Sequence, residues 1–113
     1  MQLVASPQYA KYIMKLIAEV QDRWCAVSTR NIRVLGTTLS VPADLETDWR
    51  LFMRLRNRYD TGDFRHTEDE LRAMNRFMGW IVEVNEELCA RQTRLEGVWG
   101  SQRRSPGGPS SPA

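Results

Sequence analysis

The apolar positions between residues 67 and 96 recur every three to four residues, which predicts one long helix. Thr67 followed three residues later by Glu70 has the form of a capping box, in which a hydroxyl and a carboxylate satisfy backbone N–H groups at a helix start. Two heptad positions form its seam, which predicts packing against another helix rather than catalysis. One holds Met74, Ile81, Leu88 and Leu95, and the other holds Leu71, Met78, Asn85 and Gln92.

Two further helical patterns precede it. Ser6 and Pro7 fit the N-cap and first position of a helix over residues 7–29, whose apolar stripe has the 3.6-residue period of a straight helix. Residues 43–59 follow Pro42, with acidic residues at the start and arginines at the end, as the helix dipole favours. The sequence therefore predicts a mainly α, small three-helix domain of residues 1–100 with one long C-terminal helix.

The segments between and outside these helices give weaker signals. Residues 31–41 alternate apolar and polar positions around Gly36, which is typical of a short β-hairpin or an extended arm, although an ordered loop predicts the same residues. Residues 1–5 are expected to be a loose lead-in. Residues 101–113 are rich in serine, proline and glycine, which predicts a disordered tail.

Composition excludes some classes of protein. The 113 residues are 42% hydrophobic and 27% charged, an ordinary globular balance. No stretch approaches the ~20 apolar residues of a membrane span, so we expect a protein without membrane contact. The net charge of only +2 is weak for a dedicated nucleic-acid binder.

The two cysteines, Cys25 and Cys89, lie in predicted helices, and no secretory signal precedes them. Reduced thiols in a cytoplasmic protein are the simpler interpretation, and a bridge between the first and last helices is the alternative. Two cysteines and one histidine at unrelated spacings do not form a metal site, and no cofactor motif is present.

Two short patterns could suggest an enzyme. Asp60-Thr61-Gly62 resembles the catalytic loop of aspartic proteases, but its polar flanks indicate a helix-ending turn instead of the strands that such a loop needs. His66 lies among acidic residues and could be a general base, yet solvated capping residues explain it better because no nucleophile motif is near. We therefore expect no enzymatic activity.

Arginines concentrate between residues 50 and 76. A helix–turn–helix with basic flanks could follow a phosphate backbone, which makes a nucleic-acid-binding regulator the alternative function. A solvated face paired with nearby acidic residues explains the same pattern, and the turn from Asp60 to His66 is long for a DNA-binding motif. The candidate surface consists of Arg54, Arg56, Arg58, Arg65, Arg72 and Arg76.

Asn85 interrupts the apolar seam of the long helix. A buried asparagine can pair with its copy in a coiled-coil dimer and fix the register; alternatively the helix rolls, exposing Asn85 and Gln92 and burying Phe77 and Val84. Four tryptophans in so small a chain also favour a shared interface. We therefore predict a non-enzymatic adaptor, inhibitor or regulator that binds another protein and acts as a homo-oligomer, most simply a dimer. The predicted oligomer interface is Met78, Ile81, Asn85, Leu88, Gln92 and Leu95.

Overall fold

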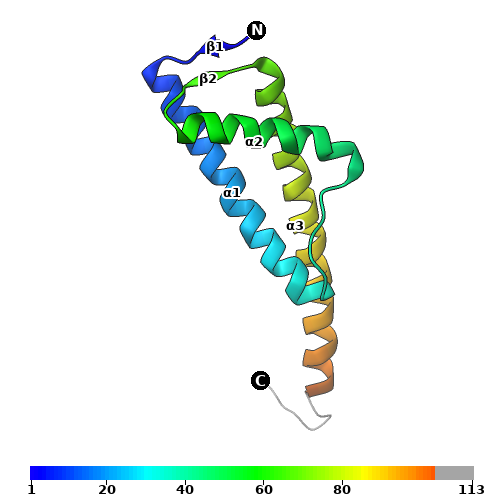
Figure 1. Ribbon diagram of the computed structural model, residues 1–113. Coiled ribbons are helices and arrows are strands. Elements are labelled where there is room, and N and C mark those ends of the chain that lie inside the picture. The colour runs from blue at the N-terminus through cyan, green and yellow to red at the C-terminus, as the bar shows by residue number, and fades with distance from the viewer. Residues whose placement is uncertain (104–113) are drawn as a thin grey trace.

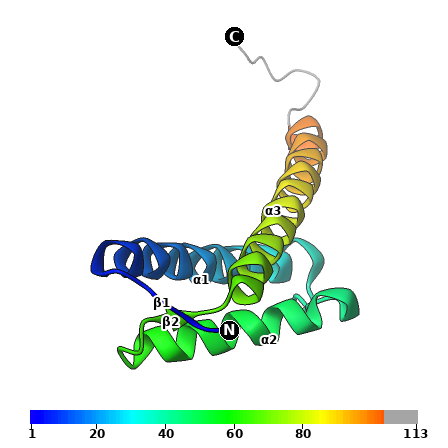
Figure 2. The same ribbon diagram turned by 90° about the horizontal axis from the view of Figure 1, so that it is seen from above.

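The fold is built on two long helices that run side by side in the same direction. The computed structural model describes the backbone of residues 1–103 and the side chains of residues 1–97. α1 (Pro7–Leu35) and α3 (Glu68–Arg103) converge toward the C-terminal end of α1, and α2 (Glu46–Asp60) lies across one face of the pair near their N-terminal halves (Figure 1). Seen from above, α1 and α2 lie nearly parallel to each other in projection, and α3 runs at a steep angle to both (Figure 2).

α1 begins at the predicted residue and ends six residues after the predicted end at residue 29. The Ser6 side chain accepts a hydrogen bond from the Tyr9 backbone N–H at 3.2 Å, and Pro7 takes the first helical position. The helix continues to Leu35 because Gly36, at φ 75°, supplies the left-handed C-cap that a side chain would disfavour. Ile32 and Val34 therefore belong to a helix, and no hairpin forms over residues 31–41, where residues 37–42 are an extended connection.

The short β element lies elsewhere. β1 (Leu3–Val4) pairs antiparallel with β2 (Arg65–His66), with Leu3 opposite His66 and Val4 opposite Arg65. The Ala5 N–H adds a hydrogen bond of 2.9 Å to the Phe64 carbonyl. The expected loose lead-in at residues 1–5 is thus tied to the segment between α2 and α3.

The end of the second helix and the start of the third lie within one residue of their predicted positions. A short 3₁₀ turn, η1 (Ala43–Leu45), leads into α2, and the turn after α2 uses Gly62 at φ 83°. α3 starts immediately after Thr67 and extends beyond the predicted end at residue 96, through Gly97 and Gly100, to Arg103. Residues 101–103 are therefore helical rather than part of the predicted tail, and residues 104–113 lie outside the described residues.

The core fills the space where all three helices meet. Trp24, Trp49 and Trp80 gather around Phe77, with ring centroids 5.2–5.7 Å from that of Phe77, so each helix contributes to one aromatic cluster. These three tryptophans are half-buried within one chain, so packing inside one chain accounts for their cluster. Trp99 lies outside the residues whose side chains are described, and a shared interface stays a prediction. The fully enclosed side chains around them are Ile13, Val20, Val27, Phe52, Leu55, Met74 and Ile81.

Candidate interaction surfaces

The seam of α3 packs within its own chain. Ile81 and Leu88 belong to the buried core, with 0% and 3% of their surface exposed, and Met78 is half-buried beside them. They are covered where α3 runs beside α1. A second chain could reach Ile81 and Leu88 only if α1 moved away.

Asn85 has a partner in the same chain. Its side-chain oxygen accepts a hydrogen bond from Nη1 of Arg30 on α1, and both side chains are half-buried. Phe77 is buried, as the rolled-helix interpretation expects, while Val84 and Gln92 are half-buried. The polar position of the seam is therefore satisfied across the α1–α3 contact.

The far end of the seam is open to solvent. Leu95 exposes 50% of its surface and Leu35, at the end of α1, exposes 44%. Together with the half-buried Val34 and with Arg91 and Arg94 they line an open cavity of about 370 Å³. We call these five residues the distal groove.

The arginine cluster is largely neutralised by acidic neighbours. Nε of Arg76 lies 3.2 Å from both carboxylate oxygens of the buried Asp48, and this hydrogen bond raises the pKa of Arg76. Among the described residues Arg54 forms no ion pair. The other predicted members pair as Arg56 with Asp60, Arg58 with Glu70, Arg65 with Asp63, and Arg72 with Glu68 and Asp69.

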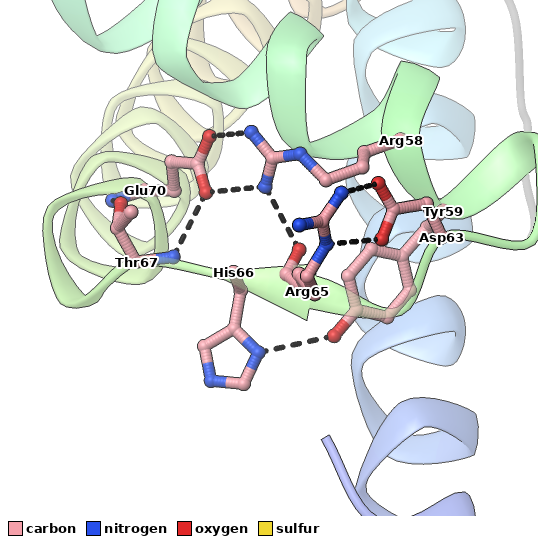
Figure 3. A network of polar contacts seen from close by, with 7 residues as sticks. All are labelled: Arg58, Tyr59, Asp63, Arg65, His66, Thr67 and Glu70. Carbon is pink, nitrogen blue, oxygen red and sulfur yellow. Dashed lines mark hydrogen bonds and ion pairs between the residues drawn. The ribbon is translucent and has the colours of Figure 1, made fainter. Parts of the chain in front are cut away.

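A polar network joins the end of α2 to the start of α3 (Figure 3). Arg58 donates to both carboxylate oxygens of Glu70, at 2.9 and 2.7 Å, and to the Arg65 carbonyl at 2.8 Å. The predicted capping box is confirmed: the Thr67 N–H donates to Glu70 at 2.9 Å, and the Glu70 N–H donates to the Thr67 hydroxyl at 3.1 Å. One carboxylate therefore both caps α3 and anchors α2.

Charge at this network is held in place by pairing. The hydrogen bond to Glu70 raises the pKa of Arg58, against the opposing effect of burial. Burial alone would raise the pKa of Glu70, but hydrogen bonds from Arg58 and the Thr67 backbone outweigh it, so the pKa of Glu70 lies below its ordinary value. Such a matched pair is typical of a structural junction rather than of a poised acid or base.

His66 is enclosed, in contrast to the solvated position expected for it. Only 4% of its surface is exposed; Nδ1 lies 3.1 Å from the Tyr59 hydroxyl, and the Tyr9 ring is 5.5 Å away. Burial raises the pKa of Tyr59. Beside it, the Thr61 hydroxyl donates to the Arg58 carbonyl, so Asp60-Thr61-Gly62 ends a helix as predicted.

Residues 1–97 hold few groups suited to other kinds of site. Within that range no group of three or more histidine, cysteine, aspartate or glutamate residues could hold a metal ion. Cys25 is exposed, Cys89 is half-buried, and both are free, so the alternative of a bridge between them is not realised. No helix in the described part of the chain is long and apolar enough to span a membrane.

One flank of α1, beside its buried stripe, carries a surface that was not predicted from the sequence. Met14, Ala18, Cys25 and Ile32 are exposed on it, and Gln21 and Ser28 are half-buried. The signal was the seven-residue repeat of 14, 21 and 28 and of 18, 25 and 32, which the stronger stripe of the same helix obscured. We call these six residues the outer face of α1.

No protein-family model, curated protein or solved structure shows significant similarity to the chain.

Proposed function

We propose that the protein is a non-enzymatic, cytoplasmic protein-interaction module that acts as a homodimer and regulates a partner protein. The observation that carries the proposal is the outer face of α1, a stripe of six uncharged residues of which four are exposed. Met14 and Ile32, at its two ends, expose 38% and 54% of their surface. Two free thiols fit a reducing compartment.

The spacing of the outer face suits a helix–helix contact. Steps of four and three residues are those of a coiled-coil seam, and the stripe from Met14 to Ile32 spans about five turns. The seam of α3, where the sequence predicts self-association, is buried within its own chain as far as Leu88. The outer face of α1 is a second stripe with this spacing, and its own chain leaves four of its six residues exposed.

The order of side-chain sizes favours an antiparallel pair of α1 helices. With the two-fold axis between residues 21 and 25, Met14 lies opposite Ile32 of the second copy, and Ala18 lies opposite Ser28. Each large residue then meets a large one at the ends, and small residues meet nearer the middle, which permits close approach. Gln21 lies opposite Cys25 and one layer from Ser28, whose enclosed hydroxyl has no hydrogen-bond partner among the described residues.

The nucleic-acid alternative is less well supported. A phosphate backbone binds arginines that can exchange water and counterions for phosphate. Arg58 and Arg76 would first have to leave the buried carboxylates of Glu70 and Asp48. An uncompensated buried charge is costly, so these arginines serve the fold better than a nucleic acid.

Mass measured against concentration tests the proposal. A contact of this size is at the small end of specific interfaces, so we expect exchange between monomer and dimer on the order of 10–100 μM. Sedimentation equilibrium should give a dimer for the native chain and a monomer for Met14→Glu with Ile32→Glu. The matched control, Lys15→Glu with Thr29→Glu on the exposed side of the same helix, should remain a dimer. A native chain that is monomeric throughout that range would overturn the proposal.

Cross-linking tests the antiparallel arrangement. In a Cys89→Ser background, a chain with Gln21→Cys and Cys25→Ser is mixed with a chain that keeps Cys25. A disulfide between the two chains should form only in the mixture, because residue 21 then faces residue 25. A parallel pair would instead join two native Cys25 residues in the unmixed sample, and that result would overturn the antiparallel arrangement.

A further inference from the structure

The distal groove exists because α1 stops before α3 does. Gly36 ends α1, whereas α3 continues to Arg103, and Figure 1 shows α3 passing beyond the end of α1. The heptad position that holds the buried Ile81 and Leu88 next falls on Leu95, which is half exposed. A seam that binds a helix for most of its length is thus left without one at this end.

The arginines around the distal groove have no ionic partners among the described residues. Arg91 and Arg94 form no ion pair with any described residue, and the same holds for Arg33 in the last turn of α1. Glu87 lies one turn before Arg91 but is not paired with it. Most arginines between residues 50 and 76 are paired. A ligand with carboxylates could therefore pair with Arg91 and Arg94 without breaking an internal contact.

We propose that the distal groove binds an acidic amphipathic helix of another protein. Leucine-sized side chains of that helix would rest on Leu35 and Leu95, completing the seam that α1 leaves open. Arg91 and Arg94 are three residues apart on α3, so carboxylates spaced three or four residues apart on the ligand would reach both. This inference rests on the proposed function, and it names the chemistry of the partner.

The apolar residues of the distal groove and its two arginines would contribute to binding together. An open cavity of about 370 Å³ accepts only a few side chains, so its apolar contacts alone give little affinity. Charge complementarity then speeds association and selects acidic over basic helices. Binding should consequently weaken as salt screens the arginines.

A designed peptide tests the proposal directly. The probe is an acetylated helix of about 18 residues with leucines on one face and glutamates on both edges. The control peptide has lysine at every glutamate position. Fluorescence anisotropy should detect the acidic peptide and show at least about tenfold weaker binding of the lysine peptide. Equal binding of the two peptides, or binding of neither, would overturn the proposal.

Charge exchange on the protein completes the test. The variant Arg91→Glu with Arg94→Glu should bind the acidic peptide about tenfold more weakly than the native chain, and it should bind the lysine peptide more tightly. Arg54→Glu, another exposed arginine without an ion pair among the described residues, should change neither. If Arg54→Glu weakens binding as much as the double variant, the attraction is general and the distal groove is not the site.

The same samples separate this inference from the proposed function. The mass of each variant is measured by sedimentation at matched concentration. Loss of peptide binding with the dimer intact is the expected result for Arg91→Glu with Arg94→Glu. A native dimer that never binds the acidic peptide would overturn the distal groove as the site but not self-association. A monomer that binds the peptide would overturn the dimer alone.

Discussion

Arg30 on α1 and Asn85 on α3, 55 residues apart in sequence, meet in a direct side-chain hydrogen bond. It places the polar Asn85 of the α3 seam opposite a helix of its own chain. Asn85 therefore has its hydrogen-bond partner without a second copy. The contact also sets which turn of α1 faces which turn of α3.

Replacement of Asn85 by leucine should accordingly leave the oligomeric mass unchanged. The guanidinium of Arg30 would lose its partner at a half-buried position, so we expect a loss of about 1 kcal/mol in the free energy of unfolding. Urea denaturation and sedimentation on the same sample provide both readings. A changed mass at equal concentration would place Asn85 in a dimer interface after all.

The pair of Arg58 and Glu70 should be the most sensitive ionic contact of the fold. Arg58→Ala leaves a carboxylate that is 98% buried without its cation, and a loss of about 3 kcal/mol is expected. Arg50→Ala is the matched control because its pair with Glu46, at 3.5 Å, is exposed on both sides and should be worth at most about 0.5 kcal/mol. Similar losses from both variants would contradict a structural role for the network.

Stability should fall in acid partly through Glu70. Its pKa in the folded chain lies below the ordinary value of 4.5, so near that pH the unfolded chain binds more protons than the folded one. The contribution of Glu70 is complete above the ordinary pKa and is lost as pH falls through the folded one. The difference in unfolding free energy between the native chain and Glu70→Gln should therefore shrink as pH drops from neutral to about 3. A difference that stays constant over this range would rule out the linkage.

Gly79 and Gly36 should respond to alanine in opposite directions. A Cβ at Gly79, inside α3, meets no atom within 4 Å, so alanine should stabilise the helix by about 0.5–1 kcal/mol. Gly36 also has open space, but its φ of 75° strains any side chain, and alanine there should cost about 1 kcal/mol. Thermal unfolding of the two variants gives the comparison, and shifts of equal sign would contradict it.

The features predicted from sequence are those encoded within a few residues. Ser6 with Pro7, and Thr67 with Glu70, begin helices through contacts over three residues, and both were identified. The segment at Ile32 and Val34 was ambiguous because the two-residue spacing of this pair suits a strand, whereas Val34 also falls seven residues after Val27 and so continues the helical stripe of α1. The left-handed Gly36, which ends the helix, decides between them.

Contacts across long sequence distances were not predictable. The pairing of Leu3 with His66 joins segments that have no shared local pattern. The sequence alone allows Arg76 to bind a ligand, and only the fold shows that it contacts Asp48 on α2. The same limit explains why the tryptophans suggested an external interface: only the crossing of three helices brings them together around Phe77.

The parallel course of α1 and α3 has a consequence for synthesis on the ribosome. Antiparallel neighbours can close as soon as a turn is made, but parallel ones cannot, and Leu95 follows Leu35 by sixty residues. At typical elongation rates the apolar stripe of α1 waits roughly 3 to 12 s for the matching part of α3. During that interval the apolar stripe of α1 has no α3 to cover it.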